Sequence, residues 1–162
     1  MNLHTQAQTQ FPADRDFMDN WGQHAYGDGY AREYQGRNGN DAILNRSVTA
    51  GFTPFGYADD YGRMGGIDED WATSFNRSVN DTRAFAAEAS ADPYKTAKFD
   101  MVQAFLYDRS GGLMDAQYWD DRVWGYSRDF PAQEIAGRNA YLRSLATYLN
   151  TQAVRSSGFV RW

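Results

Sequence analysis

Two short strings contain the residues whose types and spacing most resemble a catalytic motif. Residues 57–60 read YADD, and residues 118–121 repeat the pattern as YWDD. Paired aspartates at the turn of a β-hairpin can hold two metal ions for phosphoryl-transfer chemistry, because the turn makes both carboxylates converge. Such chemistry would require that one of the two strings lies at the turn of a β-hairpin.

Neither string has the flanking sequence that this chemistry requires. The first lies between Pro54-Phe55-Gly56 and Tyr61-Gly62-Arg63, without a β-branched run on either side. The second falls in a predicted helix, where neighbouring side chains point about 100° apart. The chain is also too short to enclose a polymerase-type site. We therefore interpret YADD as a tyrosine- and aspartate-rich loop.

Other catalytic and metal-binding patterns are equally weak. The chain has no cysteine and only two histidines, His4 and His24, and it contains no nucleophile elbow and no phosphate-binding glycine loop. His24 is more typical of a surface or stacking residue than of a ligand. A calcium site built from loop residues of the segment 28–41 is conceivable but unspecific. We expect no resident metal or cofactor.

Composition indicates one acidic domain with an aromatic core. The 162 residues suit a single globular unit, and aromatic side chains make up 16% of them. The net charge of −5 argues against nucleic-acid binding, which needs a concentrated basic surface. No secretory signal and no long apolar stretch is present. We expect no membrane insertion and a location in the cytoplasm or within an assembled particle.

The organisation of the chain changes near residue 67. Ten of the fifteen glycines fall between residues 22 and 66 and are mixed with tyrosines. Such a stretch has a high entropic cost of ordering and few aliphatic residues to offset it. We predict that residues 1–66 form an irregular Gly/Tyr-rich arm with at most one short helix, at residues 13–21.

The rest of the chain, residues 67–162, predicts a helical domain with a short aromatic tail. Apolar spacing indicates a helix over residues 68–91. A second helix begins at Asp92-Pro93 and stops at Gly111-Gly112. A shorter one covers residues 115–123, and the last runs from about Pro131 to the serines at 156–157. The fold class is therefore mainly α, with three to four helices.

Contact-forming residues outnumber catalytic ones, which favours a structural or accessory subunit. Glycine-rich arms, tyrosines, tryptophans and arginines suit protein interfaces. We predict a non-catalytic component of a large assembly, such as a virus or phage particle or another multi-subunit complex, whose partners are other protein subunits. The residues expected at the contacts are Trp21, Tyr26, Tyr30, Tyr34, Tyr57 and Tyr61 of the arm, Arg138, Arg143 and Arg155 of the last helix, and Phe159, Val160 and Trp162 of the tail.

Charge is distributed unevenly along the chain. Residues 1–121 contain 10 Lys and Arg against 19 Asp and Glu, a net −9, whereas residues 122–162 contain 6 Arg against 2 acids, a net +4. This asymmetry can be satisfied inside one fold or between subunits. We favour the internal explanation for most of it, while the arginines of the last helix remain candidates for an acidic partner surface.

Two alternative functions stay open at this stage. One is a small acid–base hydrolase acting on a glycan or a peptide, for which Glu33 or Glu69 could pair with a nearby aspartate and Glu69, close to Trp71, is the least weak candidate for the acid. The other is an adaptor that binds one soluble partner. If the arm only serves assembly, residues 67–162 should fold without residues 1–66.

Overall fold

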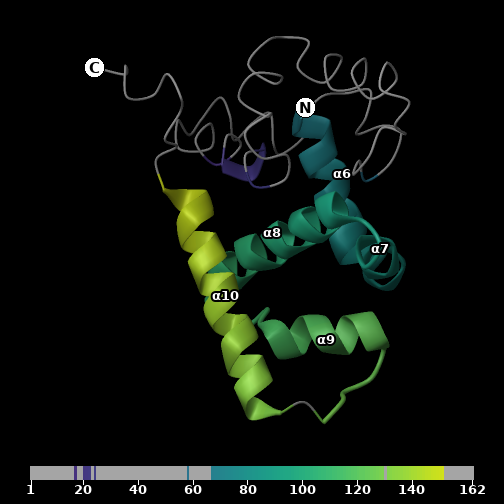
Figure 1. Cartoon of the computed structure of the whole chain (residues 1–162), viewed down its shortest axis with the longest axis vertical. Helices are drawn as coiled ribbons and strands as arrows, with labels where there is room; N and C mark the ends of the chain where they lie inside the picture. Colours follow the sequence, from purple (N-terminus) through teal and green to yellow (C-terminus); the bar gives the residue numbers. More distant parts are fainter. Residues whose placement is uncertain are drawn as a thin grey trace.

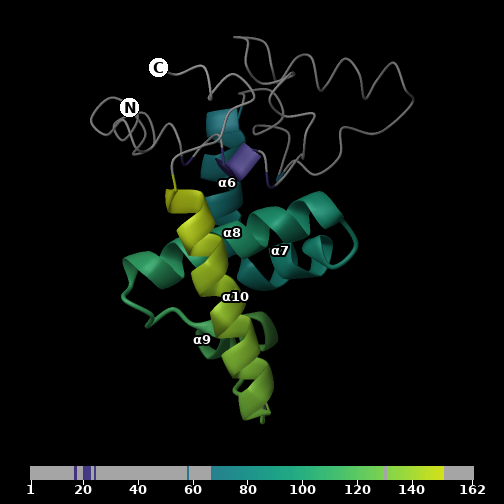
Figure 2. The ribbon, with the colours of Figure 1, turned by 60° about the vertical axis from the view of Figure 1, so that its left-hand side comes forward.

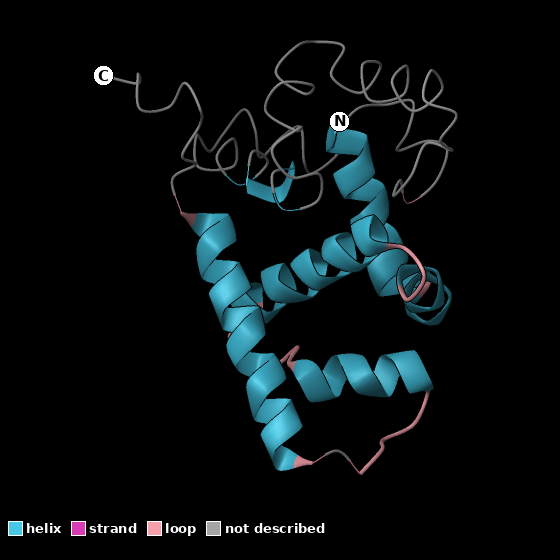
Figure 3. Cartoon of the chain, viewed as in Figure 1, coloured by secondary structure: helices cyan, strands magenta, loops and turns pink. Residues whose placement is uncertain are grey.

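The computed structural model describes Phe17, residues 20–22, His24, Ala58, and residues 67–129 and 131–151. These residues are mainly helical and include no strand, as Figure 3 shows, so the predicted mainly α class is confirmed. The helices are α6 (Ile67–Asn80), α7 (Thr82–Ala89), α8 (Pro93–Arg109), α9 (Ala116–Trp124) and α10 (Ala132–Asn150). The described residues among 17–24 are also helical.

Helix α8 lies at the centre of the described structure. It contacts α6, α7 and α10, while α9 contacts α7 and α10. Figure 1 shows α10 along one edge of the molecule, α6 above α8 and α9 below it. Figure 2 confirms this order from a second direction. α8 therefore has neighbours on several sides, which explains its wide range of buried positions.

Several helix ends follow from local sequence. Asp92 caps α8, because its carboxylate accepts hydrogen bonds from the backbone N–H groups of Tyr94 and Lys95 at 2.9 and 3.2 Å. At the other end, Gly111 and Gly112 adopt positive φ, and Gly112 N–H donates to the carbonyl of Tyr107 at 2.8 Å. The predicted start and stop of this helix are confirmed.

The predicted single helix over residues 68–91 is wrong, because the chain breaks at Asp81. Thr82 Oγ donates to the carbonyl of Ser78 at 2.6 Å, and Arg122 of α9 donates to the carbonyl of Val79. A side chain from another helix thus occupies a carbonyl that a continuous helix would use for its own hydrogen bond. The division into α6 and α7 adds one helix to the three or four expected.

The last helix also ends earlier than predicted, at Asn150 rather than near the serines at 156–157. Thr151 has an extended backbone with ψ of 157°. The amide nitrogen of Asn20 donates to the carbonyls of Tyr148 and Thr151 at 3.0 and 2.8 Å. A side chain from the N-terminal part therefore satisfies the terminal carbonyls of α10.

Aromatic rings dominate the larger core cluster. Trp71 of α6 meets the rings of Phe17, Trp21 and Phe105 edge to face, with centroids 5.0, 5.8 and 5.6 Å apart. Trp21 is fully buried. α8 and α10 complete this cluster with Met101, Val102, Ala104, Leu142, Leu145, Ala146 and Leu149. The N-terminal residues are thus part of the same core as the helical domain.

A second core cluster joins α7, α8 and α9. Phe99 of α8 lies between Phe85 of α7 and Trp119 of α9, with ring centroids 5.8 and 6.0 Å away. Ala58, the centre of the YADD string, is buried in this cluster. Trp119 is thus on the inward side of α9.

A fully buried ion pair links α6 to α8. Lys98 Nζ lies 2.5 Å from Asp70 Oδ2, and neither side chain is exposed to solvent. Asp70 Oδ1 accepts a hydrogen bond from Ala58 N–H at 3.3 Å, and the ammonium group lies 5.7 Å from the ring centroid of Trp21. Burial lowers the pKa of Lys98, an effect that the charge of Asp70 opposes.

A more exposed charge network ties α6 to α7. Arg77 donates to both carboxylate oxygens of Glu88 at 2.7 Å and to the carbonyl of Ala58 at 2.8 Å. Lys95 reaches the same carboxylate at 2.8 Å. Hydrogen bonding from Arg77, reinforced by Lys95 and opposed by partial burial, lowers the pKa of Glu88 to about 2.

Replacing Trp21 with alanine tests whether the N-terminal segment belongs to the core. We expect a loss of about 3–5 kcal/mol in the free energy of unfolding, because a buried tryptophan leaves both lost apolar contact and a cavity. Urea denaturation measures the change. Leu113→Ala is the control, since Leu113 is 81% exposed and its loss should change stability by less than about 0.5 kcal/mol. Equal effects of the two substitutions would contradict this role.

Removing one partner of the buried ion pair should be more harmful than removing both. Lys98→Met removes the ammonium group that pairs with the buried Asp70, and we expect a cost of about 3–5 kcal/mol. The double variant Lys98→Met with Asp70→Asn should recover part of this loss. A double-mutant cycle by chemical denaturation measures the coupling. Strictly additive costs would show that the two groups do not interact.

Acid should weaken the contact between α6 and α7. The folded-state pKa of Glu88 is about 2 against an ordinary 4.5, so its contribution to stability is present above pH 4.5 and is lost as pH falls toward 2. Because the Glu88 side chain is 41% exposed, solvent screening limits this contribution to about 1 kcal/mol. The stability difference between the parent and Glu88→Gln should shrink over this range. The exposed Asp108→Asn is the control, and an unchanged difference would refute the assignment.

Candidate interaction surface

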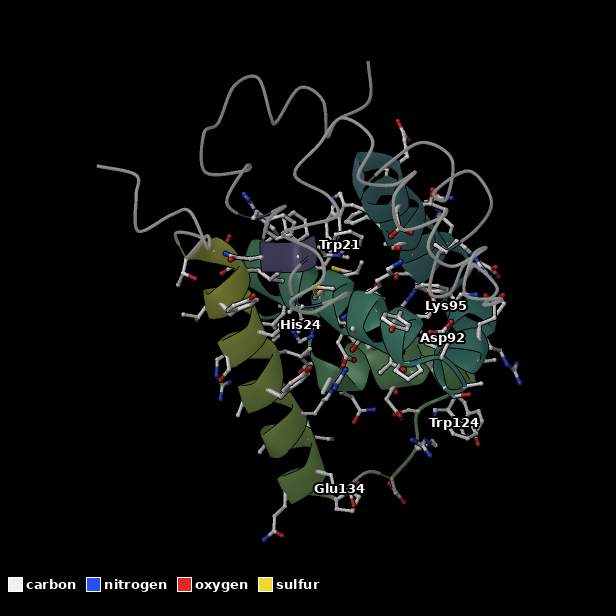
Figure 4. All side chains as sticks on the ribbon, turned by 45° about the horizontal axis from the view of Figure 1, so that its top comes forward. Trp21, His24, Asp92, Lys95, Trp124 and Glu134 are labelled. Atoms are coloured by element: carbon white, nitrogen blue, oxygen red, sulfur yellow. The ribbon has the colours of Figure 1, made fainter. Side chains whose placement is uncertain are left out.

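Two exposed aromatic side chains and a partly exposed arginine gather where α9 ends. Trp124 is the last residue of α9, and Gly125 follows with φ of 79° and donates its N–H to the carbonyl of Asp121 at 2.8 Å. This left-handed residue turns the chain away from the helix axis. Trp124, Tyr126 and Arg128, together with Asp120, are called the Trp124 cluster below. Figure 4 shows Trp124 at the outer end of α9, well away from Trp21.

The Trp124 cluster is held in place by contacts within the chain. Arg128 donates to both carboxylate oxygens of Asp120, at 3.1 and 2.6 Å. Its guanidinium carbon lies 4.2 Å from the ring centroid of Trp124, and the ring of Tyr126 lies 6.4 Å from that of Trp124. These hydrogen bonds to Asp120 raise the pKa of Arg128. The arginine therefore stays charged and supports the tryptophan ring.

Exposure distinguishes these aromatics from those of the core. Trp124 is 43% exposed and Tyr126 is 60% exposed, whereas the other described tryptophans are buried. Tryptophan, tyrosine and arginine are the residue types most enriched at protein-interface hot spots. Because Arg128 is already bonded to Asp120, less side-chain entropy remains to be lost on binding. Chemically, the cluster offers ring stacking and apolar contact.

The residues predicted for interaction fall into three groups. Trp21 is buried in the core of this chain. Arg138 and Arg143 lie on α10, where Arg138 Nη2 pairs with Asp100 at 2.5 Å and Arg143 donates to the hydroxyl of Tyr107 at 3.2 Å. The others lie outside the described residues: Tyr26, Tyr30, Tyr34, Tyr57, Tyr61, Arg155, Phe159, Val160 and Trp162.

Part of the charge asymmetry is satisfied inside the fold. Arg128 binds Asp120 and Arg138 binds Asp100, so the internal explanation favoured from the sequence holds for these two side chains. Arg122 contacts α6 and α7 through the uncharged carbonyl of Val79 and the hydroxyl of Thr82.

The two YxDD strings occupy different settings. The second lies in α9 as predicted; Asp120 binds Arg128, and Asp121 accepts a hydrogen bond from Gln117 at 2.6 Å. In the first, only Ala58 is described, and its backbone bonds to Asp70 and Arg77. The described part of each string thus contributes to packing and turn formation.

Of the two glutamates considered for catalysis, Glu69 lies half-buried in the first turn of α6, and Glu33 lies outside the described residues. His24 packs against Tyr148 with ring centroids 6.2 Å apart, and burial lowers its pKa while Asp100 opposes this. Within residues 67–129 and 131–151 and the described N-terminal positions, no three acids or histidines gather where a metal could bind.

None of the described helices combines the length and the apolar character that a bilayer-crossing helix needs.

The sequence marks the Trp124 cluster by an aromatic residue that lies off the apolar stripe of its helix. Trp119 and Val123 form the inward stripe of α9, and Trp124 lies about 100° away from Val123 on a helical wheel. A tryptophan off the apolar stripe, followed by glycine and then by Tyr126 and Arg128, marks an exposed aromatic at a helix end. What the sequence does not reveal is the hydrogen bonding of Arg128 to Asp120.

Comparison of the chain with protein families, with curated protein sequences and with solved structures found no match.

Proposed function

We propose that this chain is a non-catalytic subunit of a multi-protein assembly and that it contacts another protein through the Trp124 cluster. The observation that carries the proposal is an exposed tryptophan stacked on an arginine that is itself fixed by a bidentate bond to Asp120. A large aromatic surface without a core role is the usual centre of a protein interface.

The Trp124 cluster supports contact with a protein rather than with a charged polymer. Asp120 neutralises Arg128, so the cluster carries little net charge. Affinity for a polyanion would need unpaired cations, whereas a protein interface of this kind gains most from buried ring area. The proposal covers a virus or phage particle as well as other multi-subunit complexes, since the chemistry of the contact is the same.

The test compares the full-length parent with Trp124→Ala/Tyr126→Ala in material from the native source. Affinity purification should recover a stoichiometric protein partner with the parent, and light scattering should report the mass of the complex. Because hot-spot residues contribute at least about 2 kcal/mol, the double variant should bind at least about 30-fold more weakly.

Leu113→Ala is the matched control, because Leu113 is also an exposed apolar residue but lies outside the Trp124 cluster. It should bind as the parent does, and the double variant should unfold at nearly the parent's urea midpoint. A partner bound equally by all three proteins would refute the role of the cluster. A parent that stays a monomer without any stoichiometric partner would refute the assembly function itself.

A further inference from the structure

A pocket of about 370 Å³ lies between α8, α9 and α10. Its apolar lining comes from Ala116, Trp119 and Val123 of α9 and from Ile135 of α10. This volume falls within the range of small-molecule sites in proteins. The pocket shares Asp120 with the Trp124 cluster, but the exposed rings of Trp124 and Tyr126 do not line it.

Hydrogen-bond donors meet the apolar lining. Trp119 is 2% exposed, and its indole N–H has no acceptor in the part of the chain that the structure describes. Gln103 of α8 is also buried; its amide oxygen accepts from Arg138 Nη2 at 3.2 Å, while its amide nitrogen donates to none of the described residues. Buried donors are almost always paired in native proteins. The unpaired indole N–H of Trp119 therefore indicates that an acceptor belongs there, and Gln103, which also lines the pocket, carries a second donor.

The third polar group, Arg138, is oriented but largely neutralised. Its Nη2 pairs with Asp100, and its guanidinium carbon lies 5.0 Å from the ring centroid of Tyr141. The Tyr141 hydroxyl donates to the second oxygen of Asp100 at 3.2 Å. Burial raises the pKa of Tyr141, so this hydroxyl remains a donor at neutral pH. The guanidinium is thus fixed at the pocket without a free positive charge.

The charges around the pocket exclude one class of ligand. Asp100 balances Arg138, Arg128 balances Asp120, and the exposed carboxylate of Glu134 adds one negative charge at the lining. Figure 4 places Glu134 at the start of α10. An anionic ligand would meet net repulsion there, whereas a neutral acceptor would not.

We propose that this pocket binds a small uncharged molecule that combines an apolar ring with a carbonyl-type acceptor. The ring would lie against Ala116, Val123 and Ile135, and the carbonyl oxygen would accept hydrogen bonds from Gln103 Nε2 and Trp119 Nε1. This inference is independent of the assembly function, since it uses the inner face of α9 and not Trp124.

Nuclear magnetic resonance with three probes of one shape tests the proposal on the full chain. The probes are naphthalene-2-carboxamide, naphthalene-2-carboxylate and 2-methylnaphthalene. The carboxamide should shift the indole N–H signal of Trp119 and the side-chain amide signals of Gln103. It should also bind at least about tenfold more tightly than the other two, which lack either neutrality or the acceptor. Trp119→Phe assigns the indole signal.

Gln103→Met removes the amide donor at similar volume and should abolish the preference of the chain for the carboxamide over 2-methylnaphthalene. Gln133→Met, at an exposed position of α10, is the matched control and should keep the preference for the carboxamide. If Gln103→Met fails to fold, the affinities of the three probes for the parent chain still test the proposal. Absence of shifts at Trp119 and Gln103, or binding of the carboxylate as tight as that of the carboxamide, would overturn the proposal.

Discussion

The buried ion pair between Lys98 and Asp70 is the constraint on which the rest of the described structure depends. Removing two charges from water is costly, and their mutual attraction offsets that cost only when geometry and hydrogen bonding are good. Here the ammonium and the carboxylate lie 2.5 Å apart, and the carboxylate also holds the backbone of Ala58. Because Lys98 also faces the ring of Trp21, one polar contact links α6 and α8 with Ala58 and Trp21.

The core of the described residues has two parts, and α8 contributes to both. One is centred on Trp71 and reaches α10, while the other is centred on Phe99 and reaches α9. Edge-to-face rings supply the apolar area that the few aliphatic residues cannot. α9 is therefore attached to the core through Trp119, and Trp124 at its end is left in solvent.

The features that sequence predicts correctly are those with local causes. Asp92 and Pro93 start α8, and Gly111 and Gly112 end it, because capping and left-handed backbone depend on neighbouring residues only. The two failures have distant causes. Arg122, which donates to the carbonyl of Val79 from 43 residues away along the chain, contributes to the break at Asp81, and Asn20 bonds the end of α10 from the other end of the sequence. No periodicity analysis contains such contacts.

The same contrast between local and distant causes applies to the residues proposed for protein contacts. The residue types of an interface are visible in the sequence, yet Trp21, which looks exposed in a glycine-rich segment, is buried, and Trp124, adjacent to the inward stripe of α9, is not. Arginines of the C-terminal part are likewise engaged with Asp100, Asp120 and the carbonyl of Val79. The contact proposed through the Trp124 cluster would bury the exposed rings of Trp124 and Tyr126. Because Asp120 pairs with Arg128, net charge would have a secondary role in it.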